Sequence, residues 1–141
     1  MSTLTTVDIL NDMAFLDDWE SRYRYIIDLG RELPVMAEEL HTPSRMVKGC
    51  QSNVWMDTQV NDKKLYFIVD SDAHIVRGLL ALVLAAYDDK TAEEISNFDI
   101  DGYFQQLDLE RHLSLIRGNG LRAIVAKIRA LAAAVLADKY L

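Results

Sequence analysis

Residues 54–70, with the sequence VWMDTQVNDKKLYFIVD, encode two β-strands and the turn that joins them. Apolar and polar side chains alternate from Val54 to Val60 and again from Leu65 to Asp70, which is typical of strands with one buried face. Residues 61–64, Asn-Asp-Lys-Lys, have the composition of a hairpin turn. The pattern predicts two antiparallel strands, and Met46-Val47 is expected to add a short third strand.

The segment just before the hairpin, residues 46–55 (Met-Val-Lys-Gly-Cys-Gln-Ser-Asn-Val-Trp), contains the only cysteine of the chain. Gly49 can take a positive φ that other residues avoid, and the polar residues after Cys50 are typical of turns. We therefore expect Cys50 at the tip of a turn that leads into a strand, where its thiol can be presented to a partner.

The hairpin should bring acidic residues close to this thiol, because its second strand returns to the point where the first began. The residues concerned are Asp70-Ser71-Asp72. Two roles are open for them at this stage. Ser71 or Asp72 caps the helix that follows, or Asp72 lines a pocket beside the cysteine.

A single thiol limits the chemistry of this turn. It excludes an internal disulfide and a zinc site built from several thiolates of one chain. The thiolate is the reactive form, and a free cysteine has a pKa of about 8.5. Arg45 and Lys48 favour the thiolate, whereas apolar burial opposes it. From the turn composition alone, an inert buried cysteine and a reactive one are equally well supported.

Helical periodicity and capping signals predict the other elements. Gly30 is interpreted as the end of the second helix, and Gly78 as the site of a close contact between a helix and a strand. His41 has no partner at metal-ligand spacing and is predicted to be exposed. The expected helices are one capped by Thr5 or Thr6, one starting at Asp17-Asp18 with Glu20 as capping partner, a buried one from His74 to Tyr87, one opened by Thr91 to Glu94, one around Tyr103 to Leu107 capped by Asp99 or Asp101, a short one at Leu109 to Leu113, and a long final one capped by Gly118 or Asn119.

These elements predict an α+β fold. A small antiparallel sheet of about three strands carries helices on one face, within one domain that covers residues 1–141. Half of the residues are hydrophobic, which is enough for a core. The net charge of −7 makes the chain a poor nucleic-acid binder and suits it to a partner with a basic patch.

Targeting and metal signals are expected to be absent. Residues 1–6 lack the features of a signal peptide, and the longest apolar run, Leu79 to Tyr87, is far below the ~20 residues of a membrane span. The lone cysteine fits a reducing compartment, so we expect a cytoplasmic protein. Three histidines without shared spacing predict no metal site.

Residues 49–55, Gly-Cys-Gln-Ser-Asn-Val-Trp, resemble the signature Gly-Cys-Gln-Ser-x-Val-Trp of the SufE family of sulfur-acceptor proteins. Residues 70–79, 97–99 and 117–121 resemble further blocks of that family, in the same order and spacing. The chain departs from the family around Arg117. Leu115-Ile116 replace the usual Pro and hydroxyl residue before it, and Gly118-Asn119 replace the usual Ser and Gln after it.

This resemblance implies a function in iron–sulfur cluster assembly. Family members bind a cysteine desulfurase that uses pyridoxal phosphate, take a persulfide sulfur from it, stimulate it, and pass the sulfur to the assembly scaffold. By resemblance, Cys50 is the sulfur acceptor, and the chain carries no metal and no cofactor of its own, since pyridoxal phosphate belongs to the partner. The residues expected to form the pocket and to bind the partner are Gly49, Gln51, Ser52, Asp72 and Arg117.

The free protein is expected to shield Cys50 against Val47, Val54 and Trp55, and docking to the desulfurase is expected to swing the loop outward. Two alternatives compete with sulfur acceptance. One is a scaffold that builds clusters, although one thiolate per chain is few for that purpose. The other is a module that activates the desulfurase allosterically without covalent transfer. A thiol peroxidase is a weaker third. Self-association into a homodimer is left open.

Overall fold

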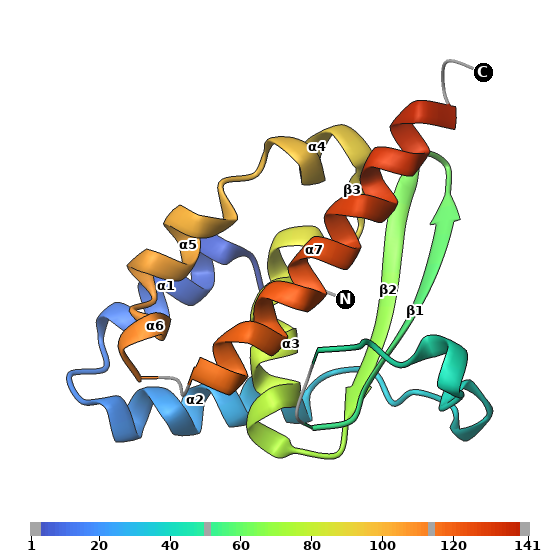
Figure 1. Ribbon diagram of the computed structural model, residues 1–141. Helices are drawn as coiled ribbons and strands as arrows, with labels where there is room; N and C mark the ends of the chain where they lie inside the picture. Colours follow the sequence, from blue (N-terminus) through green and yellow to red (C-terminus); the bar gives the residue numbers. More distant parts are fainter. Residues whose placement is uncertain (1–3, 50–51, 113–114, 139–141) are drawn as a thin grey trace.

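The computed structural model describes residues 4–49, 52–112 and 115–138. It is an α+β structure whose sheet has the order β1-β2-β3. In Figure 1 the long helices lie together on one face of the hairpin. The elements are α1 (Thr6–Ala14), α2 (Trp19–Arg31), the 3₁₀ turns η1 (Glu38–Leu40) and η2 (Pro43–Arg45), β1 (Val54–Asn61), β2 (Lys64–Ser71), α3 (His74–Tyr87), β3 (Lys90–Thr91), α4 (Ala92–Asn97), α5 (Ile100–Gln106), α6 (Leu109–His112) and α7 (Leu115–Asp138).

The hairpin forms as the alternating pattern predicts. β1 and β2 pair antiparallel along their whole length, from Val54 opposite Ser71 to Asn61 opposite Lys64. The two residues between the strands, Asp62 and Lys63, both have positive φ, 54° and 69°. Positive φ at both central residues is the requirement of a type I′ turn, whose twist matches that of the strands.

The third strand differs from the prediction. β3 pairs with Lys64 and Leu65 at the turn end of β2, whereas Met46 forms only an isolated bridge with Trp55. The backbone pairing of this segment with β1 stays a single bridge, because the cysteine turn follows directly. A two-residue strand such as β3 has no periodicity to detect, so the alternation rule does not apply to it.

The core lies between the inner face of the hairpin and the helices. The buried side chains of β2 are Leu65, Phe67, Val69 and Ser71, the odd-numbered positions that strand alternation places on one face. α3 is buried along most of its length, as predicted for a helix that is apolar nearly all round. α7 contributes an apolar stripe, in which Leu121, Ile124, Val125, Ile128 and Ala132 are buried.

α2 and α3 cross in close contact at two glycines. A Cβ atom on Gly30 would lie 2.6 Å from the backbone nitrogen of Gly78, and a Cβ on Gly78 would overlap the carbonyl oxygen of Ile26. The predicted end of α2 at Gly30 is one residue early, because α2 continues to Arg31. The predicted contact between Gly78 and a strand is likewise wrong, because the close partner is a helix.

The helix starts follow the capping signals in most cases. Thr5 and Asp8 form a capping box at α1, and Thr91 and Glu94 form one at α4. α2 begins one residue later than predicted. Its cap is Asp18, whose carboxylate accepts the N–H of Ser21 at 2.6 Å, so the expected pairing with Glu20 does not form.

α7 begins earlier than predicted. It starts at Leu115, so Gly118 and Asn119 lie within its first turns and do not cap it. Glycine costs about 1 kcal/mol relative to alanine inside a helix, which is too little to end a helix that tertiary packing supports.

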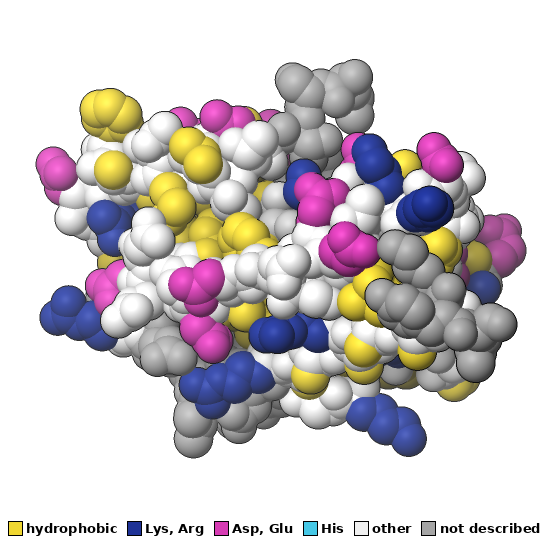
Figure 2. Space-filling model, turned by 90° about the horizontal axis from the view of Figure 1, so that it is seen from above, with side chains coloured by type: hydrophobic (Ala, Val, Ile, Leu, Met, Phe, Trp, Pro, Cys, Tyr) yellow, Lys and Arg dark blue, Asp and Glu magenta, His cyan; other side chains and the backbone are white. Residues whose placement is uncertain are grey.

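Figure 2 shows one face of the molecule, seen from above. Hydrophobic side chains gather on the side where α1 and α5 lie in Figure 1. Lys and Arg side chains are interspersed with Asp and Glu, and no continuous basic stripe crosses this face. Among the described residues, no helix combines the length and apolar character needed to cross a membrane.

Candidate functional site

The base of the cysteine turn is closed by contacts between the residues on its two sides. The N–H of Val47 donates to the carbonyl of Val54 at 2.9 Å. Both side chains are buried, with 7% of Val47 and 0% of Val54 exposed. The chain thus leaves the core and re-enters it at adjacent points. Cys50 and Gln51, which the sequence places in this turn, lie outside the described residues, so the predicted shielding of Cys50 stays a prediction.

Gly49 has the positive φ that its place beside the cysteine predicts. Its φ is 93°, a conformation that L-residues with a side chain rarely adopt. A Cβ atom at this position would lie 3.4 Å from the Cβ of Ala123 in α7, an ordinary contact. The backbone angle, and not a lack of space, therefore selects glycine here. The same contact places the turn beside α7.

Asp72 attaches the returning side of the turn to the start of α3. Its carboxylate accepts the N–H of Asn53 at 3.1 Å, and its own N–H donates to the carbonyl of Asn53 at 3.3 Å. The capping alternative is wrong, because the N-cap of α3 is Ala73, without a side-chain hydrogen bond. The hydroxyl of Ser71 accepts the N–H of Ala73, at 3.3 Å, and does not cap α3.

The outer face of the hairpin carries a polar network that the sequence analysis did not find. Trp55 and Asp70 are cross-strand partners, so both side chains lie on this face. The ring of His41 lies against both. Its Nε2 is 2.6 Å from Oδ2 of Asp70, and its centroid is 4.7 Å from that of Trp55 in an edge-on arrangement. His41 was predicted to be exposed, but only 23% of its side chain is.

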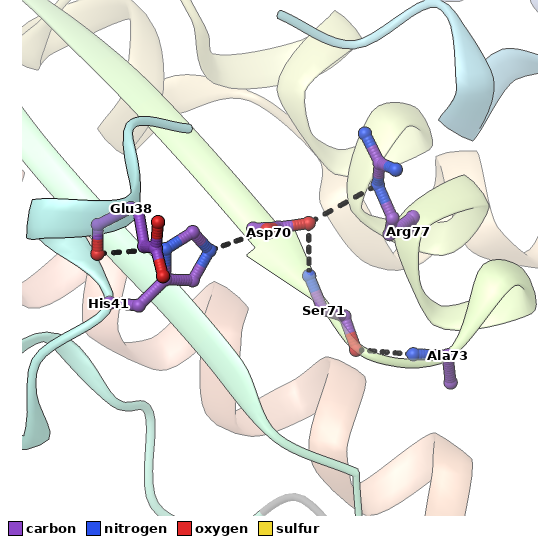
Figure 3. A network of polar contacts seen from close by, with 6 residues as sticks. All are labelled: Glu38, His41, Asp70, Ser71, Ala73 and Arg77. Carbon is purple, nitrogen blue, oxygen red and sulfur yellow. Dashed lines mark hydrogen bonds and ion pairs between the residues drawn. The ribbon is translucent and has the colours of Figure 1, made fainter. Parts of the chain in front are cut away.

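Asp70 connects this histidine to the first turns of α3 (Figure 3). Its Oδ1 accepts the N–H of Ser71 at 2.8 Å and lies 3.4 Å from Nε of Arg77. That nitrogen is buried without an aligned hydrogen bond, so the contact is an ion pair by distance only. The hydrogen bond to Asp70 raises the pKa of His41 above its usual value, and this effect outweighs the opposing effect of partial burial.

Arg45 is held close to the turn by a second ion pair. Its Nε donates to Oδ1 of Asp57 on β1 at 2.9 Å, and its Nη1 donates to Oγ1 of Thr42 at 3.1 Å. The charge that was expected to favour the thiolate is thus shared with a carboxylate, which weakens its effect on the cysteine. The side chain of Lys48, the other cation of the turn, is exposed.

The described residues contain no group of three or more His, Cys, Asp or Glu side chains that could hold a metal ion. The site is therefore a turn with two attached sides. Its chemistry depends on a thiol whose position is outside the described residues.

Comparison with known proteins decides the family. The family described as "SufE: Fe-S metabolism associated domain" matches residues 7–132. The chain belongs to the SufE family. Its role is accordingly in iron–sulfur metabolism.

Two SufE-like relatives and one solved structure are similar to this chain. An uncharacterized SufE-like protein of Rhizobium etli is 50% identical over 125 residues, which is 86% of this chain and 84% of the relative. One of Rhizobium meliloti is 47% identical over 131 residues, 89% of this chain and 94% of the relative. The solution structure of a hypothetical protein from Thermus thermophilus has a TM-score of 0.76 at 17% identity, over 97% of this chain and 99% of that one. It shows the fold alone.

The structure brings together part of the predicted SufE site. Gly49, Ser52 and Asp72 lie at or beside the turn, and Asp72 contacts the turn directly through Asn53. Arg117 lies in the first turn of α7, and not in the loop before a helix that the sequence predicted. Its side chain, like Cys50 and Gln51, lies outside the described residues.

Sequence reasoning missed His41, Asp70 and Arg77 as a connected group. His41 was tested only for metal-ligand spacing. The feature that could have indicated this group was Asp70. The hairpin register places this acidic residue opposite Trp55, on a partly covered face where a carboxylate needs a polar partner. What covers that face is the segment of η1 and η2, which lacks periodicity of its own.

Proposed function

We propose that this SufE-family protein accepts sulfur from a cysteine desulfurase that uses pyridoxal phosphate. In this scheme Cys50 becomes a persulfide, the desulfurase is stimulated because its product is removed, and the sulfur passes to the iron–sulfur scaffold. The chain needs no cofactor of its own. The reducing conditions of the cytoplasm suit a lone thiol that must stay free.

The observation that carries this proposal is the Gly-Cys-Gln-Ser-x-Val-Trp signature on a turn whose two sides are attached to the core. Residues 49–55 carry the signature in a chain that matches the SufE family over residues 7–132. The bond from Val47 to Val54 fixes the base of the turn. Such a base allows the tip to meet a second protein without disturbing the fold, and sulfur exchange between two proteins requires that access.

The transfer step is a displacement at sulfur and balances without an oxidant. The Cys50 thiolate attacks the outer sulfur of the donor persulfide, and a new S–S bond forms at Cys50. The S–S bond within the donor breaks, and its electron pair leaves on the donor thiolate. The terminal sulfur keeps its proton throughout. The chain has only one cysteine, so no second thiol of the same chain discharges the product.

The other signature residues support this step in the proposal. Gly49 provides the positive φ that turns the chain before the cysteine. We assign Gln51, Ser52 and Arg117 to contacts with the desulfurase or with the bound sulfur. Asp72 holds the returning side of the turn through Asn53.

The variant Cys50→Ser tests the proposal against its rivals. We expect it to fold normally, to accept no labelled sulfur from the desulfurase, and to lose stimulation of alanine release from cysteine. Retained stimulation without sulfur acceptance would favour the allosteric module. A purified wild-type protein that is coloured and contains iron would favour the scaffold.

A matched control separates loss of the thiol from damage to the turn. Ser44→Ala removes an exposed hydroxyl near the turn, to which the proposal gives no role, and leaves Cys50 in place. Labelled sulfur should appear on this variant, and its loss there would show that turn geometry, and not the thiol alone, limits the assay.

A further inference from the structure

Both ring nitrogens of His41 face hydrogen-bond acceptors. Nε2 lies 2.6 Å from Oδ2 of Asp70, and Nδ1 lies 3.2 Å from the carbonyl oxygen of Glu38, as Figure 3 shows. A carbonyl oxygen and a carboxylate only accept. A neutral imidazole has one N–H, whereas an imidazolium has two. Both contacts are hydrogen bonds at the same time only when His41 is protonated.

The groups that surround the ring of His41 come from β1, β2, α3 and η1. Asp70, from β2, is the one carboxylate that contacts the ring among the described residues, and Arg77 of α3 lies on its far side at 3.4 Å. Trp55 of β1 presents a ring at 81° to the imidazole. The η1 segment supplies the carbonyl of Glu38. Asp57, two residues after Trp55 and so on the same face of β1, is paired with Arg45.

His41 begins the segment that leads into the cysteine turn. This entry segment, residues 41–47, is attached to the sheet at three points, two through side chains and one through the backbone bridge at Met46 and Val47. His41 binds Asp70, Arg45 binds Asp57, and the N–H of Val47 binds the carbonyl of Val54. Of these three attachments, only the first includes a group that titrates near neutral pH.

We propose that His41, in its imidazolium form, and Asp70 are positioning residues that hold the entry segment of the cysteine turn against the sheet. Loss of the proton removes one of the two hydrogen bonds and the charge attraction, so the turn becomes less restrained as the pH rises. This inference deepens the proposed function, and it rests on that function only where sulfur transfer is concerned.

The protonation of His41 can be read from Trp55. The chain has two tryptophans, so Trp19→Phe leaves Trp55 as the only fluorescent indole. An imidazolium in contact with an indole quenches its fluorescence more than a neutral imidazole does. We expect a quenching midpoint above pH ~6.5, the usual histidine value. Asp70→Asn should lower the midpoint, while Asp28→Asn, which breaks the exposed pair with Arg31, should leave it unchanged.

The effect on the turn is read from alkylation of Cys50 by iodoacetamide. The rate is measured for the wild type and for His41→Gln at each pH, and the ratio of the two rates is taken, since the thiolate fraction enters both. Below the midpoint we expect the variant to react about threefold to tenfold faster, as loss of a charge-assisted hydrogen bond implies. Above it, where the wild type has lost one of the two hydrogen bonds and the charge attraction, the ratio should fall towards one.

Two results would overturn the inference. One is a Trp55 midpoint that is not raised, or that Asp70→Asn does not lower. The other is an alkylation ratio that stays constant with pH. Neither readout uses a sulfur donor, so both decide the positioning role even if Cys50 accepts no sulfur. Sulfur acceptance that persists in His41→Gln would leave the proposed function intact.

Discussion

Single residues near the cysteine turn are fixed by partners that are distant in the sequence. Asp70 is the clearest case, because its carboxylate contacts His41 from one segment and Arg77 from another. Its side chain is only 21% exposed. Attraction to the two cations offsets the hydration free energy that the carboxylate loses on partial burial. One acidic residue thereby ties the approach to the turn, the end of β2 and the start of α3 together.

The stability contributed by His41 should depend on pH with a defined sign. The pKa of His41 is raised in the folded protein. Its contribution is therefore fully present below pH ~6.5, the unfolded value, and is lost as the pH rises through the folded-state pKa. We expect urea unfolding to show the wild type more stable than His41→Gln at pH ~6, with a smaller difference at pH ~9. A difference that grows with pH would contradict the ion pair.

Cys50 and its neighbours could be proposed as a site from sequence because the signature is local. The positive φ of Gly49 also follows from local chemistry. The partners of His41 and Asp72 could not be assigned in the same way. His41 meets Asp70 across 29 positions, and Asp72 meets Asn53 across 19. Such contacts depend on how the hairpin and the η1 segment pack, and the residue type alone does not identify the partner.

At the scale of elements, a substitution in the turn of the hairpin should stabilise the folded protein. Lys63 has a φ of 69°, which costs a residue with a side chain about 1–2 kcal/mol. We expect Lys63→Gly to raise the free energy of unfolding by about 0.5–1 kcal/mol, after the greater freedom of glycine in the unfolded chain is subtracted. Lys64→Gly, within β2, is the control and should lower it. Equal effects of the two substitutions would argue against the type I′ turn.

The crossing of α2 and α3 should be sensitive to one added methyl group. Gly78→Ala gains helix propensity, but its Cβ meets the backbone of Ile26, which moves only if the whole helix does. We expect a net loss of about 1–3 kcal/mol in the free energy of unfolding by urea.

Gly102→Ala is the matched control for this crossing. The three atoms nearest to its Cβ would all belong to the side chain of Asp99. Gained propensity and a weakened cap should offset each other to within about 1 kcal/mol. If Gly78→Ala were as well tolerated as this control, the two helices would not be in backbone contact.

Elements with strong local signals were predicted correctly, and those set by packing were not. The capping boxes at Thr5 and Thr91 place the starts of α1 and α4. β3 pairs through two residues only. The start of α7 extends past Gly118, whose weak helix preference suggested a boundary there. The contact that decides β3 comes from β2, another part of the chain.

At the scale of the whole molecule, the α+β fold and the SufE family agree with the predictions from the sequence. The helices cover one face of the sheet, and the η1 segment covers the other face at the base of the hairpin, where Trp55 and Asp70 lie. The residues on both sides of the cysteine turn are thus held against the sheet. A net charge of −7 suits docking to a partner with a basic surface.

The central claim, that Cys50 accepts sulfur, is tested most directly by intact-mass spectrometry after incubation with cysteine and a desulfurase. We predict a gain of about one sulfur atom on the wild-type chain, reversed by a reducing thiol and absent when Cys50 is alkylated beforehand. An unchanged mass under conditions in which the desulfurase is active, or a gain that persists on the alkylated protein, would contradict it.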